Sequence, residues 1–177
     1  NGDRTMTSIL KVDTLQKANG ATPTAADLGI NVTGNVLQTA VVNFSDQVNT
    51  NNQSDTEVSS SLRVTITPRS ATSKFVVFLC YHVVTVAGAS HATVFPLRMI
   101  NNGSWQNVSN YSTGNKNEAH RNAFSTGEFI TATQVILDEP ATTSAVTYSL
   151  FMRTNGSNIR INDNGCDTRI VVQEIAG

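Results

Sequence analysis

The sequence contains little charge. Asp, Glu, Lys and Arg make up 14% of its 177 residues, whereas they make up about 25% of an average globular protein. The 12 basic side chains nearly balance the 13 acidic ones, so the net charge is −1. Nucleic acids and anionic membranes bind basic surfaces, and neither is therefore an expected partner.

Cysteine and long apolar runs are also scarce. The two cysteines, Cys80 and Cys166, are too few for a disulfide framework. Cys80 lies within an apolar segment and Cys166 in the loop sequence NDNGCDT, so we expect no bridge between them. No run approaches the roughly 20 apolar residues of a membrane-spanning helix, and we expect no signal peptide. We therefore expect no membrane insertion, and folding in a reducing cytoplasm fits.

What the sequence does contain is a series of β-strand patterns, the clearest of which lies in residues 61–86. Leu62, Val64 and Ile66 alternate with polar residues, which predicts a strand with one buried face. Residues 75–84 are almost continuously apolar, so both faces of that strand require burial. Because an antiparallel sandwich strand normally keeps one face in water, a neighbouring subunit or the N-terminal arm should cover the second face. The residues predicted at an oligomer interface are Phe75, Val77, Leu79, Tyr81 and Val83.

Similar patterns recur along the chain and predict an all-β protein. The predicted strands are 36–44, 57–67, 74–86, 93–100, 104–108, 128–137, 145–153, 158–162 and 168–176. Hairpin turns are indicated at Asn101–Gly103 and at Asn155–Gly156. The number of strands, the mixed loop lengths and the long polar segment 109–127 favour a jelly-roll-like antiparallel β-sandwich over an up-and-down barrel. Residues 35–177 should form this sandwich, and residues 1–34 a short extended arm or linker.

The sequence carries no recognisable catalytic constellation. Its three histidines have neither metal-ligand nor triad spacing. Asp138 and Glu139 are adjacent, so in a strand they point to opposite faces and cannot form a glycosidase pair by themselves. We expect no enzyme activity and no cofactor. One alternative stays open, because four oxygen-bearing side chains could bind calcium without the EF-hand spacing: Asn162, Asp163, Asn164 and Asp167.

The best candidate for a binding site is the segment 101–121. Trp105 is the only tryptophan, and it follows a hairpin turn. Aromatic rings can stack on sugar faces while neighbouring polar side chains bind hydroxyl groups. The predicted ligand-binding residues are Trp105, Asn107, Asn110, Tyr111, Asn117, His120 and Arg121. The alternative is that Trp105 is a packing residue that fills an end of the sandwich or a subunit seam.

Several segments resemble a family of phage proteins. They are SILKVDTLQ, GATPTAADLGINVTGNVLQ, SLRVTITPRSATSKFVV, DEPATTSAVTYSL and the terminal VVQEIAG, which together cover the chain discontinuously. They are similar to tail-fibre and other virion structural proteins of phages that infect marine bacteria, including cyanophages. The resemblance implies a homotrimer of β-sandwiches whose N-terminal arm joins other virion proteins. Residues 87–127 carry no family pattern, so the resemblance transfers no ligand residue.

These observations lead to an expected function. The chain should be a non-enzymatic virion protein of a tail fibre or other surface appendage, synthesised in the host cytoplasm. As a receptor-binding domain it would recognise a cell-surface glycan or an outer-membrane component, and weak sites on a trimer would gain avidity. The alternative is a structural virion component without receptor binding, such as a capsid-decorating knob or a tail connector. A polysaccharide depolymerase is the third possibility.

Overall fold

A computed structural model of the chain describes residues 16–23, 33–86, 90–108, 122–124, 127–156 and 158–177. The chain divides into two compact units, residues 1–32 and residues 33–177. In the first unit, the described residues contain a turn in which the Gly20 amide donates to the Lys17 carbonyl oxygen (2.9 Å). No helix in the described part of the chain is long and apolar enough to cross a membrane.

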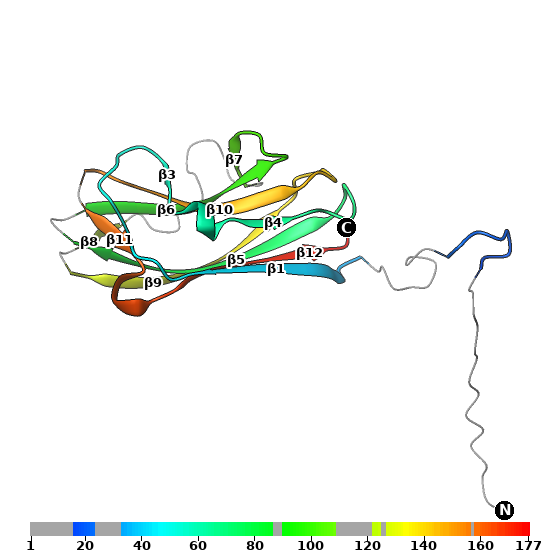
Figure 1. The fold of residues 1–177 in the computed structure, drawn as a ribbon, viewed down its shortest axis with the longest axis horizontal. Coiled ribbons are helices and arrows are strands. Elements are labelled where there is room, and N and C mark those ends of the chain that lie inside the picture. The colour runs from blue at the N-terminus through cyan, green and yellow to red at the C-terminus, as the bar shows by residue number, and fades with distance from the viewer. Residues whose placement is uncertain (1–15, 24–32, 87–89, 109–121, 125–126, 157) are drawn as a thin grey trace, which may run out of the picture. The chain divides into compact units, whose positions relative to one another are not determined.

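The second unit consists of two antiparallel sheets that face each other (Figure 1). Sheet A contains β1 (Val36–Phe44), β2 (Val48–Thr50), β5 (Lys74–Thr85), β9 (Phe129–Asp138), β11 (Ile159–Ile161) and β12 (Thr168–Ile175). Sheet B contains β3 (Thr56–Glu57), β4 (Val64–Ile66), β6 (Ser90–Ile100), β7 (Trp105–Asn107), β8 (Asn122–Phe124) and β10 (Val146–Thr154). Two 3-10 turns complete the described elements, η1 (Ser60–Leu62) and η2 (Asp163–Gly165).

The order of the strands is that of a jelly roll. The main strands of sheet A run β1-β12-β5-β9, and those of sheet B run β4-β10-β6-β7. Along these main strands the chain changes sheet at every connection except the β6–β7 hairpin. Two interleaved Greek keys produce this pattern. The expected fold class, an all-β jelly-roll-like antiparallel sandwich, is therefore confirmed.

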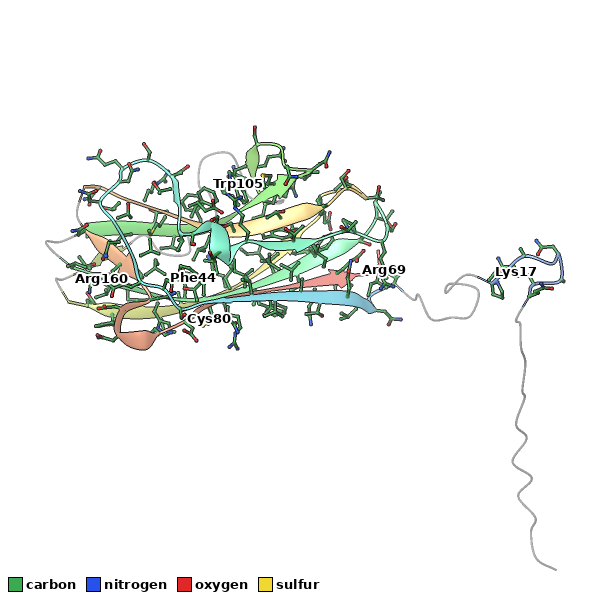
Figure 2. All side chains as sticks on the ribbon, in the orientation of Figure 1. Lys17, Phe44, Arg69, Cys80, Trp105 and Arg160 are labelled. Atoms are coloured by element: carbon green, nitrogen blue, oxygen red, sulfur yellow. The ribbon has the colours of Figure 1, made fainter. Side chains whose placement is uncertain are left out.

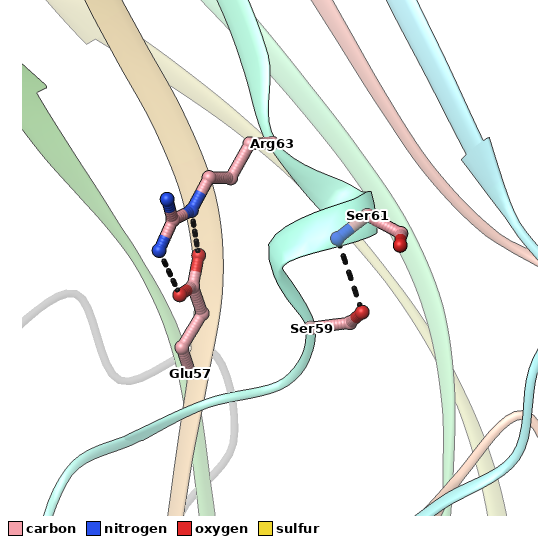
Figure 3. Close-up of polar contacts among 4 residues, drawn as sticks. All are labelled: Glu57, Ser59, Ser61 and Arg63. Carbon is pink, nitrogen blue, oxygen red and sulfur yellow. Dashed lines mark hydrogen bonds and ion pairs between the residues drawn. The ribbon is translucent and has the colours of Figure 1, made fainter.

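The segment predicted as one strand, 57–67, divides into β3, η1 and β4. The division follows from a local hydrogen bond, in which the Ser61 amide donates to the Ser59 hydroxyl (3.1 Å; Figure 3) and starts the 3-10 turn. The alternation read from the sequence nevertheless holds across the turn. The apolar residues of the segment are buried: Leu62, Val64 and Ile66.

β5 lies in the middle of sheet A, with β12 and β11 on one side and β9 on the other. The residues predicted at an oligomer interface form its inner row instead. Each is at most 1% exposed and packs in the core of its own chain: Phe75, Val77, Leu79, Tyr81 and Val83. The prediction chose the wrong one of the two faces of β5. Neighbouring residues of a strand point to opposite faces of the sheet, so an assignment that is off by one residue exchanges the two faces. The outer row is half-buried and consists of Val76, Phe78, Cys80 and His82.

A buried carboxylate lies where β9 ends. Asp138 is fully buried and accepts hydrogen bonds from the Arg98 guanidinium (2.5 Å) and the Tyr148 hydroxyl (2.9 Å). Burial raises the pKa of Tyr148, and the neighbouring Asp138 charge adds to this effect. The adjacent Glu139 side chain instead forms an exposed ion pair with Lys74 (3.0 Å). The two carboxylates therefore point apart, as the sequence predicted.

Replacing Tyr148 by Phe should lower the free energy of unfolding by about 1.5–3 kcal/mol, because a buried carboxylate loses a charge-assisted hydrogen bond. Tyr81→Phe is the matched control. The Tyr81 hydroxyl is buried in the same core and has no hydrogen-bond partner among the described residues, so its loss should leave stability unchanged or slightly raised. Urea denaturation at neutral pH measures both variants. Equal destabilisation of the two would contradict the assigned role of the Tyr148 hydroxyl.

Candidate functional site

The structure describes two of the seven residues predicted to bind a ligand. Trp105 and Asn107 lie at the two ends of β7. The other five lie outside the described residues: Asn110, Tyr111, Asn117, His120 and Arg121. The described part of the candidate site therefore consists of β7 and the elements that surround it.

The hairpin of β6 and β7 places Trp105 on sheet B. Its turn is closed by a hydrogen bond from the Gly103 amide to the Ile100 carbonyl oxygen (2.9 Å). Asn101 and Asn102 both have positive φ, 48° and 56°, as a type I′ hairpin turn requires. Asparagine tolerates this left-handed conformation better than most residues. The hairpin predicted at this position is thus confirmed, and Met99 pairs with Trp105 across it.

Trp105 belongs to a small aromatic cluster on the outer face of sheet B (Figure 2). Its ring meets the Phe151 ring edge-on, with centroids 5.0 Å apart and planes at 68°. Phe151 in turn stacks on Phe95 (6.2 Å), which it faces across the β10–β6 ladder. Edge-on and offset aromatic pairs of this kind are attractive beyond their buried area. The cluster therefore fixes the indole ring on a rigid support.

An arginine held by a glutamate covers part of the indole. The Arg63 guanidinium carbon lies 5.3 Å from the centroid of the Trp105 ring, which is the range of a cation–π contact. Arg63 donates two hydrogen bonds to Glu57 (2.7 and 2.6 Å; Figure 3). Burial alone would raise the pKa of Glu57, but hydrogen bonding, chiefly from Arg63, and the Arg63 charge outweigh it and lower that pKa from its ordinary value of 4.5. Glu57 is therefore a carboxylate at neutral pH and orients Arg63.

These contacts bear on the two alternatives for Trp105. The ring is half-buried, with Phe151 against it and Arg63 over it, so Trp105 packs on sheet B while part of its ring stays uncovered. Asn107 is exposed and lies on the same side of β7, two residues along the strand. A ligand could contact three groups at this site: the uncovered part of the Trp105 indole, the Asn107 amide and the Arg63 guanidinium. Sequence spacing could not find Glu57 and Arg63, because the fold alone brings them to Trp105.

Some of the described residues that could take part in metal chemistry are engaged in ordinary structural contacts. Asn162 accepts a hydrogen bond from the Thr168 hydroxyl (2.7 Å), and Asp163 pairs with Arg160 (2.8 Å). Two members of the sequence-level calcium candidate are thus already bound to protein groups. In the described part of the chain, no group of three or more His, Cys, Asp or Glu is placed to hold a metal ion. Both cysteines are free thiols.

No protein-family model and no curated protein matches this sequence. Among solved structures, the chain is similar to Eiger TNF from S. frugiperda, with 10% identity and a TM-score of 0.46 over 80% of this chain and 94% of that one. It is also similar to the infectious bursal disease virus Gx strain structure, with 8% identity and a TM-score of 0.41. That match covers 79% of this chain and 37% of the viral chain. The jelly-roll assignment rests on the strand order of this chain itself.

Protonation of Glu57 should release Arg63 from its place over Trp105. Because the pKa of Glu57 is lowered in the folded protein, the stabilisation from its carboxylate is complete above the unfolded value and is lost as the pH falls through the folded value. Trp105 is the only tryptophan, so its fluorescence reports the change directly. We expect the emission of the folded protein to shift as the pH falls below 4.5.

Two variants control this titration. In Glu57→Gln the emission should already resemble that of the low-pH protein and should vary little with pH. In Glu139→Gln the exposed ion pair with Lys74 of sheet A is removed, whereas Trp105 lies on sheet B, and the titration should match the unmodified protein. An unchanged titration in Glu57→Gln would show that Glu57 does not control the environment of the indole.

Proposed function

We infer that this chain is a non-enzymatic phage virion protein that acts as a receptor-binding domain of a tail fibre. Three observations support the inference. The sequence segments quoted above resemble virion proteins, the described chain folds as a jelly roll, and 14% charged residues leave a surface poor in charge. The receptor would be a glycan or an outer-membrane component of the host. The N-terminal arm would join the domain to the virion.

The observation that carries host attachment is the fixed indole beside Asn107. Phe151 and Arg63 hold Trp105 in place, so little conformational freedom is lost when a ligand contacts its uncovered part. A sugar ring has an apolar face that can lie on the indole and hydroxyl groups that Asn107 can bind. The contact surface is small, so one site binds weakly. Several copies on one appendage raise the avidity through effective concentration.

A structural virion component remains the second candidate, and one observation favours it. The outer face of sheet A exposes large apolar side chains on β1 and β9, which is typical of a protein contact surface. A knob or connector would use this face to dock onto a capsid or tail and would need no host ligand. The two candidates therefore predict different partners for the isolated protein.

Binding to host cells tests the proposal. Trp105→Ala and Asn107→Ala should each weaken binding at least about tenfold, because each removes a direct ligand contact. Asn51→Ala, at an exposed asparagine in a different loop, should bind like the unmodified protein. Trp105→Phe should recover part of the binding by restoring an aromatic ring. Thermal melts of all four variants check that they are folded.

Unchanged cell binding of both alanine variants would remove the indole site from the proposal. Attachment of the protein to phage capsids or tails, without any attachment to cells, would favour the structural component. Release of reducing ends from host polysaccharide would overturn the non-enzymatic assignment.

A further inference from the structure

The outer face of sheet A differs from every other described surface of the molecule in its exposed apolar side chains. The large apolar residues that are exposed in the described part of the chain all lie on β1 or β9, which are both edge strands of this sheet: Val36, Val41, Phe129, Val135 and Leu137. Val135 is 62% exposed and Val41 56%. Scattered single residues of this kind are common on proteins, but residues gathered on one sheet indicate a contact surface.

The pairing of the strands joins these residues into a continuous stripe. On the outer face, Val41 of β1 lies opposite Val171 of β12, Val171 opposite Phe78 of β5, and Phe78 opposite Val135 of β9. The next row on the same face contains Val76 opposite Leu137. Directly opposite side chains in a sheet are about 5 Å apart. We call these six residues the apolar stripe: Val41, Val76, Phe78, Val135, Leu137 and Val171.

The apolar stripe carries no charged side chain, and the charges nearest to it have partners. Arg169 lies one row away and donates to the Asn43 side chain (2.6 Å). Lys74, one row away on the other side, pairs with Glu139 (3.0 Å). β9 itself contains no charged residue before Asp138, although edge strands usually carry charges or prolines that prevent association. An apolar centre with polar groups around it is the composition of a protein–protein interface.

The opposite face of the sandwich does not have this character. On sheet B the outer aromatic residues are covered within the chain, since Trp105 packs on Phe151 and Arg63 lies over Trp105. The ionic pairs of Arg63 with Glu57 and of Arg153 with Asp55 lie among these segments. No comparable cover lies over the apolar stripe among the residues of the sandwich unit that the structure describes, because its outermost members remain exposed.

We propose that the apolar stripe is a contact surface between copies of this chain, with the same face of a second copy as its occupant. Two sheets pack face to face through interdigitating side chains, and a second copy supplies a matching apolar sheet face through symmetry. Four strands and about eight residues of β5 give a face of roughly 19 by 27 Å. Two such faces, counted with the polar rows on either side of the stripe, bury about 1,000 Å² in projection, which is the lower limit for a specific interface. A net charge of −1 gives little repulsion between copies.

The oligomeric state of the full chain tests this proposal. Light scattering coupled to size exclusion should give a mass above that of one 19.0 kDa chain. Val135→Asp and Leu137→Asp should each raise the dissociation constant at least about tenfold, because a carboxylate would be buried without a partner at the contact. Thr143→Asp adds the same charge at an exposed loop position and should leave the mass unchanged. Val135→Thr keeps a β-branched, uncharged residue and should weaken association less.

Alkylation of the two cysteines gives an independent measure on the same samples. Cys80 lies on β5 beside the stripe, on the outer side of sheet A (Figure 2), while Cys166 follows η2. Cys80 should react more slowly in the associated protein and faster in Val135→Asp, whereas the rate at Cys166 should not change. This measurement also separates a failure to fold from a failure to associate, because unfolding would expose both thiols.

Three outcomes would overturn the proposal. The unmodified chain could be a single molecule at high concentration with Cys80 freely reactive. It could be a single molecule with Cys80 protected until Val135→Asp is introduced, which would mean that residues 1–32 cover the stripe. Lastly, it could associate with a mass that neither aspartate variant changes, which would place the contact elsewhere. None of these results bears on cell binding through Trp105, so the two proposals fail separately.

Discussion

The alternation of side chains along β5 is the constraint on which the rest of the sandwich depends. Its inner row fills the space between the sheets and includes the fully buried Phe75 and Tyr81. Each buried apolar side chain of this size contributes about 1.5–3 kcal/mol. Because β5 pairs with β9 over ten consecutive residues and with β12 over seven, its register also decides which side chains of those strands face the core. The same register places the residues of the apolar stripe next to one another on the outer face of sheet A.

The two outer faces of the sandwich differ in how far other segments of the chain cover them. The β6–β7 hairpin and the segment around η1 bring Trp105 and Arg63 onto sheet B. These additions cover Phe95 and Phe151, which are buried although they point away from the core between the sheets. Sheet A receives no such addition from the described residues of its own unit. A face that is closed by its own chain suits a rigid small-ligand site, whereas an open apolar face suits a protein partner.

The sequence predicted most of the strands, the jelly roll and the hairpin at Asn101–Gly103, because these depend on local periodicity and on turn chemistry. It did not predict which face of β5 points inward. Both faces of that strand are apolar, so only its pairing with β9 and β12 separates them. The 3-10 turn at Ser60–Leu62 was also missed, since a serine cap in an alternating segment gives little signal. The partners of Trp105 come from distant parts of the sequence, and no spacing rule connects them.

The ends of the sandwich unit meet beside one another, and this affects how the domain would respond to load. The Gly34 amide donates to the Ala176 carbonyl oxygen (2.8 Å), and the Ala176 amide donates to that of Asn35 (2.9 Å). β1 and β12 are antiparallel neighbours, so a pull between residues 33 and 177 would open their ladder one pair at a time, like a zipper. A pull between one of these ends and a distant point of the domain would not open the ladder in this way. The two adjoining ends therefore define a direction in which the domain is weak under load.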